Sequence, residues 1–301
     1  MYSQAPSYRG RFAPSPTGHL HFGSLLAATA SYLQARKYDG EWWLRIEDID
    51  PPREVSGASS HIIQTLKNYQ FEWDNLSYQS QRNDIYAYYI KELLDKNLAY
   101  YCGCSRTEIS QYQARHKLKP SVYPGICRNG LNGKQPRSIR LKVDKNPVIV
   151  DDAIQGKQSR YLAELSGDFI IKRADGFYAY QLAVAIDDSE QKMGQVVRGF
   201  DLHESSFSQR YLCNVLALNS PEYAHIPVVT NQSGQKLSKQ SAAPDIANET
   251  PQDVLWHALN CLQQSPPKAL RSKSLKDLWQ WAKQHWDLKK IPNIEKFASA
   301  K

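Results

Sequence analysis

The chain has 301 residues, enough for one large domain with insertions or for two domains with separate cores. Hydrophobic residues make up 41% of it, which argues against a disordered chain. No apolar run is long enough to span a membrane, and residues 1–9 lack the apolar core of a secretory signal. Five cysteines, an odd number, suit a reducing compartment better than a disulfide scaffold, so we expect a cytoplasmic protein.

The net charge of +8 and the isoelectric point near 9.1 indicate an anionic partner. Much of this charge lies near the C-terminus, where residues 267–301 hold nine Lys or Arg and three acidic residues. Such a segment is either a solvated helix face or a surface that contacts phosphates. Composition alone leaves both interpretations open.

The first hundred residues alternate between strand and helix patterns. We predict a strand at 9–14, a helix at 23–37, a buried strand at 41–46, and helices near 57–69 and 83–96. In the first helix, Leu25, Leu26, Thr29 and Leu33 fall on one side. The alternation predicts a doubly wound α/β sheet of the Rossmann type.

This alternation stops near Tyr100. Residues 101–135 hold three cysteines, many turn residues and few periodic positions, whereas 138–150 and 168–172 alternate like half-exposed strands. We interpret residues 101–176 as an insertion between two halves of the sheet domain.

The α/β pattern resumes at 178–186, with a strand at 195–198 and a helix from about 204 to 218. After the Pro266-Pro267 break we expect an amphipathic helix with an apolar stripe of Leu275, Leu278, Trp279, Ala282 and Trp286. The expected division of the chain is the first half of the sheet domain at 1–100, the insertion at 101–176, the second half at 177–245 and a basic helical region at 246–301.

One segment near the N-terminus carries the signals of an anion site. Arg11-Phe-Ala-Pro-Ser-Pro-Thr-Gly-His-Leu-His-Phe-Gly-Ser24 reads as a strand, a tight Pro/Gly turn and a helix start. Such a junction directs backbone N–H groups, here around Gly23, and the positive end of a helix dipole at an anion. His19 and His21 add two imidazoles that can reach phosphate oxygens. A turn of this kind is often only a turn, but the stacked constraints favour a site.

A second segment, Lys236-Leu-Ser-Lys-Gln240, is a short basic loop able to close over a polyphosphate. Alone it would usually be a solvated loop. In amino-acid activation a carboxylate attacks the α-phosphate of ATP in line and expels pyrophosphate, so catalysis depends on positioning and on neutralising phosphate charge. Lys236 and Lys239 suit that second task, and the chemistry implies Mg²⁺ bound with the ATP.

Three charged residues fall at predicted strand ends, where α/β proteins bind ligands. Arg11 can pair with a carboxylate through both arms of its guanidinium, Glu47 can hold an α-ammonium group, and Arg198 is a second cation. Two cations favour a substrate with an acidic side chain. For each residue the competing interpretation is a surface ion pair of little energetic value.

With these motifs in place, the sequence resembles the glutamyl-tRNA synthetase branch of the class I aminoacyl-tRNA synthetases. The likeness covers about residues 9–245 and includes Arg45-Ile-Glu-Asp-Ile-Asp50, Tyr178–Ala183, Asp187-Asp188 and Val197–Asp201. It implies a class I Rossmann domain, an ATP site at His21, Gly23 and Lys239, with His19, His21, Lys236 and Lys239 as catalytic residues. It places the glutamate pocket on Arg11, Phe12, Ala13, Pro14, Ser15, Glu47, Tyr180 and Arg198. The chain departs from the class signatures at Ser24 and Gln240, and neither change removes a charge from the lysine loop.

Only about 60 residues follow the lysine loop, too few for the anticodon-binding region of a full glutamyl-tRNA synthetase. The chain therefore resembles the short glutamyl-Q tRNA(Asp) synthetases. This resemblance implies activation of L-glutamate by ATP without tRNA, followed by transfer to the queuosine base in the anticodon of tRNA(Asp). Two alternatives stay open: a truncated glutamyl-tRNA synthetase that charges a tRNA 3′ end, and a non-enzymatic zinc-dependent RNA-binding module.

The three cysteines of the insertion suggest a metal site. Cys102, Cys104 and Cys127 are close in sequence, and zinc prefers four Cys or His ligands. The competing interpretation is three buried free thiols. For the fourth ligand, His116 is the chemical default, whereas the family resemblance points to Tyr123. We expect one structural zinc ion on Cys102, Cys104, Tyr123 and Cys127, with the remaining Cys213 and Cys261 in the core.

Overall fold

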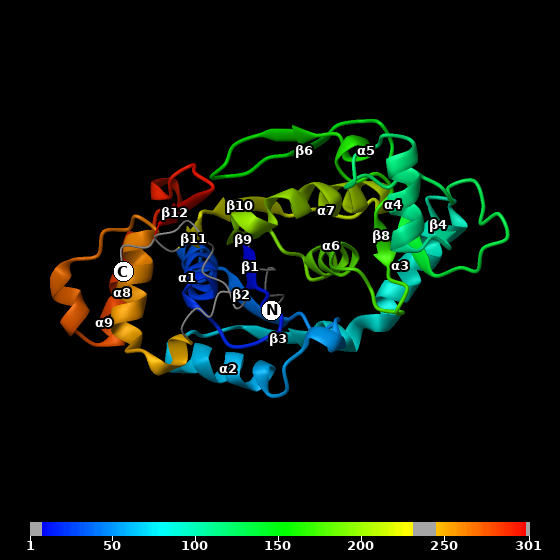
Figure 1. Cartoon of the computed structure of the whole chain (residues 1–301). Coiled ribbons are helices and arrows are strands. Elements are labelled where there is room, and N and C mark those ends of the chain that lie inside the picture. Colours follow the sequence, from blue (N-terminus) through cyan, green and yellow to red (C-terminus); the bar gives the residue numbers. More distant parts are fainter. Residues whose placement is uncertain (1–7, 231–244, 299–301) are drawn as a thin grey trace, which may run out of the picture.

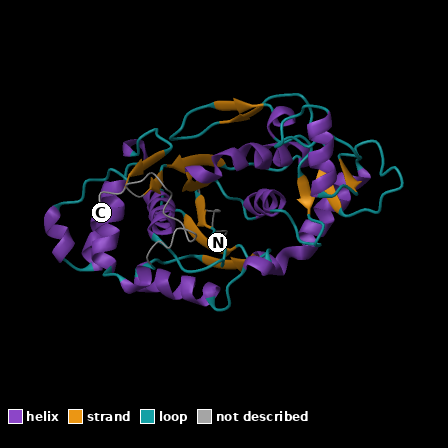
Figure 2. Cartoon of the chain, in the orientation of Figure 1, coloured by secondary structure: helices purple, strands orange, loops and turns teal. Residues whose placement is uncertain are grey.

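The computed structural model describes residues 8–230 and 245–298. The molecule is elongated: a parallel sheet occupies its centre, the helices α8 (Pro251–Cys261) and α9 (Leu275–His285) form one end, and the segment around α4 (Arg106–Arg115) forms the other (Figures 1 and 2). None of the described helices has the length and apolarity to cross a membrane.

Two sets of parallel strands make up the central sheet. In spatial order these strands are β10 (Glu222–Ile226), β9 (Gln195–Gly199), β1 (Arg9–Phe12), β2 (Glu41–Ile46) and β3 (Asn75–Tyr78). Gly194 donates its backbone N–H to the carbonyl of Arg9 (2.8 Å), which places β9 beside β1. The chain order reverses at this point, so the predicted doubly wound parallel sheet is confirmed. Ligands bind at such a switch point, at the carboxyl ends of the strands.

Successive strand residues point to opposite faces of the sheet, and both faces are covered. Leu44 and Val197 join the core beneath α1 (Phe22–Lys37), whereas Val196 joins a second core on the other face. The second core is built with the helices α3 (Asn83–Asp95), α6 (Tyr180–Glu190) and α7 (His203–Leu216). Parallel strands buried on both faces are expected to be largely apolar, and the buried Arg45 of β2 and Arg198 of β9 are therefore exceptions that need partners.

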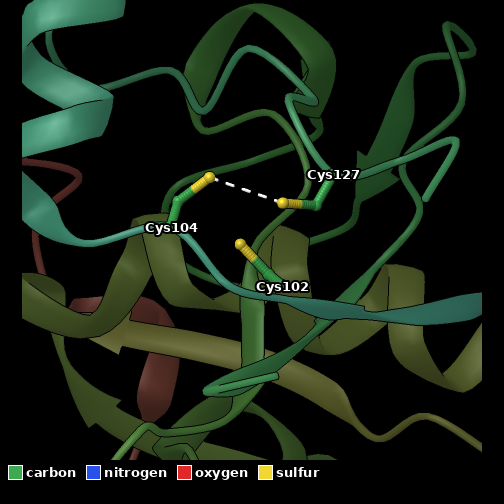
Figure 3. Close-up of side chains that lie close together, drawn as sticks. All are labelled: Cys102, Cys104 and Cys127. Carbon is green, nitrogen blue, oxygen red and sulfur yellow. Dashed lines mark hydrogen bonds between the residues drawn. The ribbon is translucent and has the colours of Figure 1, made fainter. Parts of the chain in front are cut away.

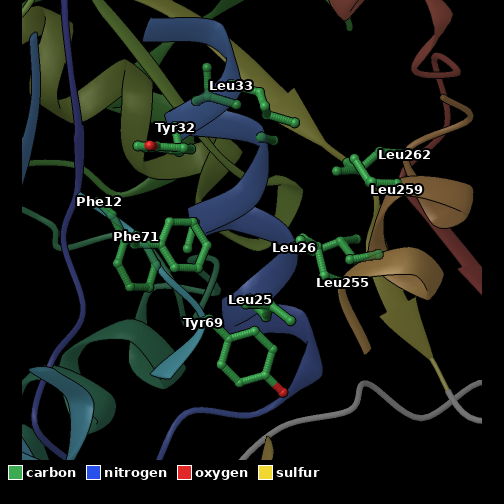
Figure 4. Close-up of a cluster of buried hydrophobic side chains, with 14 of the residues drawn as sticks. Phe12, Leu25, Leu26, Tyr32, Leu33, Tyr69, Phe71, Leu255, Leu259 and Leu262 are labelled. Atoms are coloured by element: carbon green, nitrogen blue, oxygen red, sulfur yellow. The ribbon is translucent and has the colours of Figure 1, made fainter. Parts of the chain in front are cut away.

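The helix α1 is more central than its sequence pattern predicts. We expected one apolar side, but the buried residues run almost without interruption from Leu25 to Ala35. Figure 4 shows the reason: α1 stands between Phe12, Tyr69 and Phe71 on one side and the leucines of α8 on the other. The helix α2 (Ala58–Asn68) completes this core.

The predicted insertion contains an antiparallel sheet of β4 (Ala99–Cys102), β5 (Ser138–Leu141) and β8 (Ile170–Lys172). A ribbon of β6 (Val148–Val150) and β7 (Gln158–Arg160) and the short helix α5 (Leu162–Leu165) lie between β5 and β8 in the chain. Helix α4 was not predicted from the sequence, although Ser105 and Glu108 form a capping box at its start. This helix buries only Gln113, which is why it shows no apolar period.

The C-terminal region is packed against the sheet domain. The predicted stripe of α9 is buried, and the indole N–H groups of Trp279 and Trp286 bond the Tyr69 carbonyl and the Gln34 side chain (both 2.8 Å). The helix α8, which the sequence analysis did not identify, fills the space between α1 and α9. The strand β12 (Lys296–Ala298) pairs with β11 (Val228–Thr230) and returns the chain toward the central sheet.

Candidate active site

A cleft of about 330 Å³ opens at the switch point of the sheet, at the carboxyl ends of β1, β9 and β10. Its lining comes from the turn after β1, the start of α1 and the segment after β9, and it includes Arg11–Ser15, His21, Gly23, Tyr180, Arg198 and Asp201. A smaller side cavity of about 50 Å³ contains Glu47 and shares Ser15, Thr17 and Tyr180 with the main cleft. The two cavities therefore adjoin.

The turn between β1 and α1 is shaped by its glycine and proline residues. Gly18 has a φ of 137°, which L side chains rarely adopt. The carbonyls of Pro14 and Pro16 accept N–H groups from Glu47 (3.0 Å) and Val55 (2.9 Å), so the loop is tied to the segment after β2. The predicted strand 9–14 ends at Phe12, because prolines cannot continue a hydrogen-bonded ladder.

His21 is the N-cap of α1. Its Nδ1 accepts the backbone N–H of Ser24 (3.3 Å), so this imidazole satisfies one of the free donors of the helix start. His21 and Gly23 both line the cleft. His19 does not: its side chain is 53% exposed, its Nδ1 pairs with Asp245 (2.7 Å), and its ring stacks on His61.

Arg11 is buried in an ionic cluster. Its Nε and Nη2 both donate to the carboxylate of Asp188 (3.1 Å each). Arg45 donates to the same carboxylate (2.5 Å) and to Gln191 (2.8 Å). Although burial opposes ionisation, the two guanidinium groups lower the pKa of Asp188 to about 2. The cluster fixes Arg11 at the wall of the cleft.

Glu47 is buried, and within the described part of the chain its carboxylate has an unsatisfied hydrogen-bond acceptor. Its Oε1 has no hydrogen-bond partner among the described residues, and the nearest cation, Nη2 of Arg45, is 3.7 Å away. Burial raises the pKa of this carboxyl to about 7, against the opposing effect of Arg45 and Arg11. A buried acceptor without a donor is costly, so this site favours a ligand that brings N–H groups.

In the same described ranges, Arg198 has an unsatisfied hydrogen-bond donor, which complements the unsatisfied acceptor of Glu47. Its Nε donates to Nε2 of His225 (3.0 Å), and its Nη2 donates to Ser206 and Gln209 (2.8 Å each). Its Nη1 is buried and has no partner among the described residues. The guanidinium therefore keeps one donor group for an acceptor in the cleft.

The remaining predicted residues divide into two groups. Phe12, Ala13, Pro14 and Ser15 line the main cleft, and the half-buried Tyr180 lies between it and the side cavity. Lys236 and Lys239, with Gln240, lie outside the described residues. The structure thus gathers the glutamate-pocket and helix-start residues of the prediction, and it leaves the lysine loop as an expectation.

Comparisons with known proteins identify the family of this chain. Residues 7–253 match the model of the class I tRNA synthetases for Glu and Gln, catalytic domain. The chain is 47% identical over 287 residues to a glutamyl-Q tRNA(Asp) synthetase of Chromobacterium violaceum, covering 95% of both chains. It is 45% identical to one of Dechloromonas aromatica, covering 95% of this chain and 96% of that one. The chain belongs to the glutamyl-Q tRNA(Asp) synthetase family.

Members of this family are synthetase-like ligases, and solved structures support the same fold. A glutamate-tRNA synthetase from Elizabethkingia anophelis is 26% identical, with a TM-score of 0.81 over 97% of this chain and 68% of that one. A glutamate tRNA ligase from Elizabethkingia meningosepticum, solved in complex with its amino acid, is 25% identical, with a TM-score of 0.80 over 97% and 67%.

The three cysteines predicted to bind zinc also lie close together in the structure. Sγ of Cys104 is 3.4 Å from Sγ of Cys127, and the thiols of Cys102, Cys104 and Cys127 converge within 4.8 Å (Figure 3). The hydroxyl of Tyr123 is 3.3 Å from Sγ of Cys102 and 3.7 Å from Sγ of Cys104. His116, the alternative fourth ligand, does not belong to this cluster, and its ring packs against Tyr112. As expected, Cys213 is buried in the core, whereas Cys261 is only partly buried.

Several residues that hold the cleft were not predicted as site residues. Arg45 and Asp188 appeared only within family motifs, and His225 and Asp152 were not singled out. The only available signal was the charge of Arg45 and Asp188 within apolar elements, because a buried charge needs a partner. His225 and Asp152 are 73 residues apart and gave no signal in sequence.

Proposed function

We propose that this protein activates L-glutamate with ATP in the absence of tRNA and transfers the glutamyl group to the queuosine base in the anticodon of tRNA(Asp). One observation carries the proposal: among residues 8–230 and 245–298, adjoining parts of a single cleft hold a buried carboxylate oxygen of Glu47 without a donor and a buried guanidinium nitrogen of Arg198 without an acceptor. The ammonium and carboxylate groups of an amino acid supply both missing partners, and two cations in the lining, Arg11 and Arg198, favour one with an acidic side chain.

In this proposal the α-ammonium group of glutamate donates to Glu47. The side-chain carboxylate of glutamate accepts hydrogen bonds from Arg198 and from the edge of Arg11 that lines the cleft. The segment Phe12–Ser15 supplies the wall beside the reacting carboxylate, and Tyr180 closes the space between the two cavities. Charge-assisted hydrogen bonds in a buried site are stronger than neutral ones, which favours glutamate over glutamine.

ATP would occupy the main cleft. Leu20, Leu26, Ile226 and Val229 offer an apolar wall for a base, and the start of α1, with His21 and Gly23, offers a site for phosphates. We assign the pyrophosphate leaving group to Lys236 and Lys239. His19 stays in the proposed catalytic set as a neighbour of this turn, although it is held by Asp245.

The reaction takes two steps. A carboxylate oxygen of glutamate attacks the α-phosphorus of ATP, the bond to the β-phosphate bridging oxygen breaks, and pyrophosphate leaves. A hydroxyl of the queuosine cyclopentene-diol then attacks the acyl carbon, AMP leaves with the electron pair of the broken bond, and the hydroxyl proton passes to the departing phosphate or to water. Mg²⁺ bound with ATP neutralises phosphate charge. The protein residues hold the reacting groups in line.

The RNA target rests on the names of the relatives. The basic side chains of the C-terminal region are exposed wherever they are described, as contact with RNA phosphates requires. The test is transfer of radiolabelled glutamate to tRNA(Asp), followed by RNase mapping. Label in the anticodon fragment supports the proposal, whereas label in the acceptor fragment identifies a truncated glutamyl-tRNA synthetase.

A second measurement tests activation itself. Glutamate-dependent ATP–pyrophosphate exchange without tRNA is expected for the purified protein. Its absence in metal-loaded protein would favour the zinc-dependent RNA-binding module. This assay and the mapping assay separate the two parts of the proposal.

We also propose one structural zinc ion on Cys102, Cys104, Tyr123 and Cys127. Tetrahedral zinc with bonds of about 2.3 Å places its sulfur ligands about 3.8 Å apart, close to the 3.4 Å between Cys104 and Cys127. Burial works against ionisation of Cys102, but the Tyr123 hydrogen bond and Arg140 lower its pKa to about 7, toward the thiolate that binds metal.

The zinc proposal is tested with Cys127→Ser. We expect this variant to lose stoichiometric zinc, measured by elemental analysis, because one of four ligands is gone. The matched control is Cys261→Ser, which changes a cysteine outside the cluster and should retain the metal. Equal zinc content in the two variants would show that the ligand set is wrong.

A further inference from the structure

His225 is a buried imidazole that the proposed reaction does not use. It lies on β10 opposite Arg198 of β9, and its Nε2 accepts the Nε–H of Arg198 at 3.0 Å. An arginine Nε–H can only donate, so Nε2 of His225 must present a lone pair. The ring proton is then on Nδ1, which bonds the carboxylate of Asp152. Burial lowers the pKa of His225 to about 4, in agreement with a neutral ring.

The carboxylate of Asp152 is held by several backbone N–H groups. It follows β6, and its Oδ1 accepts the backbone N–H groups of Ile154 (2.9 Å) and Gln155 (2.8 Å). The backbone N–H of His225 lies 3.2 Å from each of its oxygens. Although burial opposes ionisation, the His225 and backbone hydrogen bonds lower the pKa of Asp152 to about 2. The carboxylate therefore holds both the orientation and the tautomer of the ring.

The remaining partners of Arg198 are also neutral. Its Nη2 donates to Ser206 and Gln209, and the Leu202 carbonyl is 3.3 Å away. His225 is thus the only described partner of Nε. Without it, a planar guanidinium held only at Nη2 can rotate about that point, and the direction of Nη1 changes with it.

A metal site is the competing interpretation of this cluster. Asp152, His203 and His225 bring ligand atoms within 4.8 Å of one another. However, both ring nitrogens of His225 are engaged in hydrogen bonds, and one of those bonds comes from a guanidinium cation. A cation bound here would break the bond to Arg198 and lie beside its charge, so the arrangement favours a hydrogen-bonded relay.

We infer that Asp152 and His225 are positioning residues that fix the Arg198 guanidinium, so that its Nη1 meets an anionic oxygen of the amino-acid substrate. The identity of that substrate rests on the proposed function. A fixed donor discriminates a carboxylate from a carboxamide, because the amide N–H groups would face other N–H groups. Since Asp152 belongs to the proposed insertion, residues 101–176 contribute to amino-acid selection in the cleft.

The kinetic test uses His225→Phe, which keeps a ring but removes the hydrogen bonds to Arg198 and Asp152 and the 3.2 Å contact between Nε2 and the Ser206 hydroxyl. In ATP–pyrophosphate exchange we expect the KM for glutamate to rise about 10- to 100-fold, the KM for ATP to stay unchanged and the preference for glutamate over glutamine to fall. His225→Gln should restore part of the loss, because its carbonyl oxygen can accept the Nε–H. The matched control is His285→Phe on the exposed face of α9, expected to behave as wild type.

Asp152→Asn tests the tautomer directly. Its amide N–H would face Nδ1 and force the ring proton onto Nε2, where it opposes the N–H of Arg198. Two-bond ¹H–¹⁵N spectra are expected to show the Nδ1–H tautomer of His225 in the wild type and the Nε2–H tautomer in the variant.

Two outcomes would overturn the inference: an Nε2–H ring or an imidazolium in the wild type at neutral pH, or a folded His225→Phe protein with unchanged KM and unchanged glutamate preference. Absence of exchange in the wild type would reject the proposed function instead. The spectra would still report the hydrogen bonds in that case.

Discussion

The two sides of the cleft hold their arginines in opposite ways. On the β1–β2 side, Arg11 and Arg45 share the carboxylate of Asp188, so buried charges compensate one another. On the β9–β10 side, the described hydrogen-bond partners of Arg198 are neutral, and the carboxylate of Asp152 reaches it only through the ring of His225. The first arrangement stabilises the fold, whereas the second leaves a nearly full charge for a ligand.

This difference explains how a single cleft combines rigidity with recognition. A guanidinium that is already paired with a carboxylate gains less from a second anion, because its field is partly cancelled. A guanidinium held by uncharged groups keeps its field and its free N–H donors. Substitutions of the two arginine surroundings should therefore affect different quantities: replacing Asp188, which pairs with Arg11 and Arg45, should mainly lower stability, whereas replacing Arg198 should mainly weaken substrate recognition.

The largest expected effect is on stability. Asp188→Asn removes the shared anion and leaves two buried guanidinium groups uncompensated, so the free energy of unfolding should fall by about 3–5 kcal/mol. Urea denaturation of the wild type and the variant measures this difference in the free energy of unfolding. The matched control is Asp253→Asn, whose exposed pair with Arg271 should contribute less than about 1 kcal/mol. Similar small losses in both variants would show that the β1–β2 cluster does not stabilise the fold.

The second largest effect should appear in glutamate recognition by Arg198. Arg198→Lys keeps the charge but loses the fork of donors, so kcat/KM for glutamate in ATP–pyrophosphate exchange should fall about 100-fold. Its melting temperature should change less than that of Asp188→Asn. If Arg198→Lys unfolded the protein as readily as Asp188→Asn does, the distinction between the two sides would fail.

Glu47→Gln should have a smaller effect on the same assay. The amide keeps one carbonyl acceptor for an ammonium group but loses the charge, so the KM for glutamate should rise about 10- to 30-fold with little change in the KM for ATP. Glu54→Gln is a suitable control, because Glu54 lines the same side cavity but is exposed. Equal behaviour of the two variants would remove Glu47 from the ammonium site.

The sequence predicted the parts of the fold that depend on local pattern. Helix α3 was found because its apolar residues recur at the helical period, and strand β2 because it is a nearly continuous apolar run. The site residues from Arg11 to Gly23 were found because prolines, glycines and histidines are concentrated in one turn. The Asp152–His225–Arg198 contact could not be found, because it joins three segments whose approach is set only by packing of the sheet.

Two further failures have physical causes. Helix α4 was missed because it buries almost nothing, so its capping box was the only signal. The central position of α1 was missed because Ala28, Ala30 and Ala35 carry little hydrophobicity of their own, and their burial depends on α8, which lies more than 200 residues away in the chain. In both cases the tertiary surroundings decide burial.

The smallest expected effect is a pH dependence that belongs to the β1–β2 side alone. Burial raises the pKa of Glu47 to about 7, and an ammonium ligand binds the ionised form, so glutamate affinity should fall about tenfold between pH 8 and pH 6. In the ligand-free protein the sign is opposite: the protonated form is favoured by folding, so this contribution to stability is present below about pH 4.5 and is lost as the pH rises through 7. Calorimetric titration should show the slope in glutamate affinity in the wild type and not in Glu47→Gln. In urea denaturation, the stability difference between the wild type and Glu47→Gln should change with pH in the direction given above. A slope in glutamate binding that survives Glu47→Gln would assign the titration to another group.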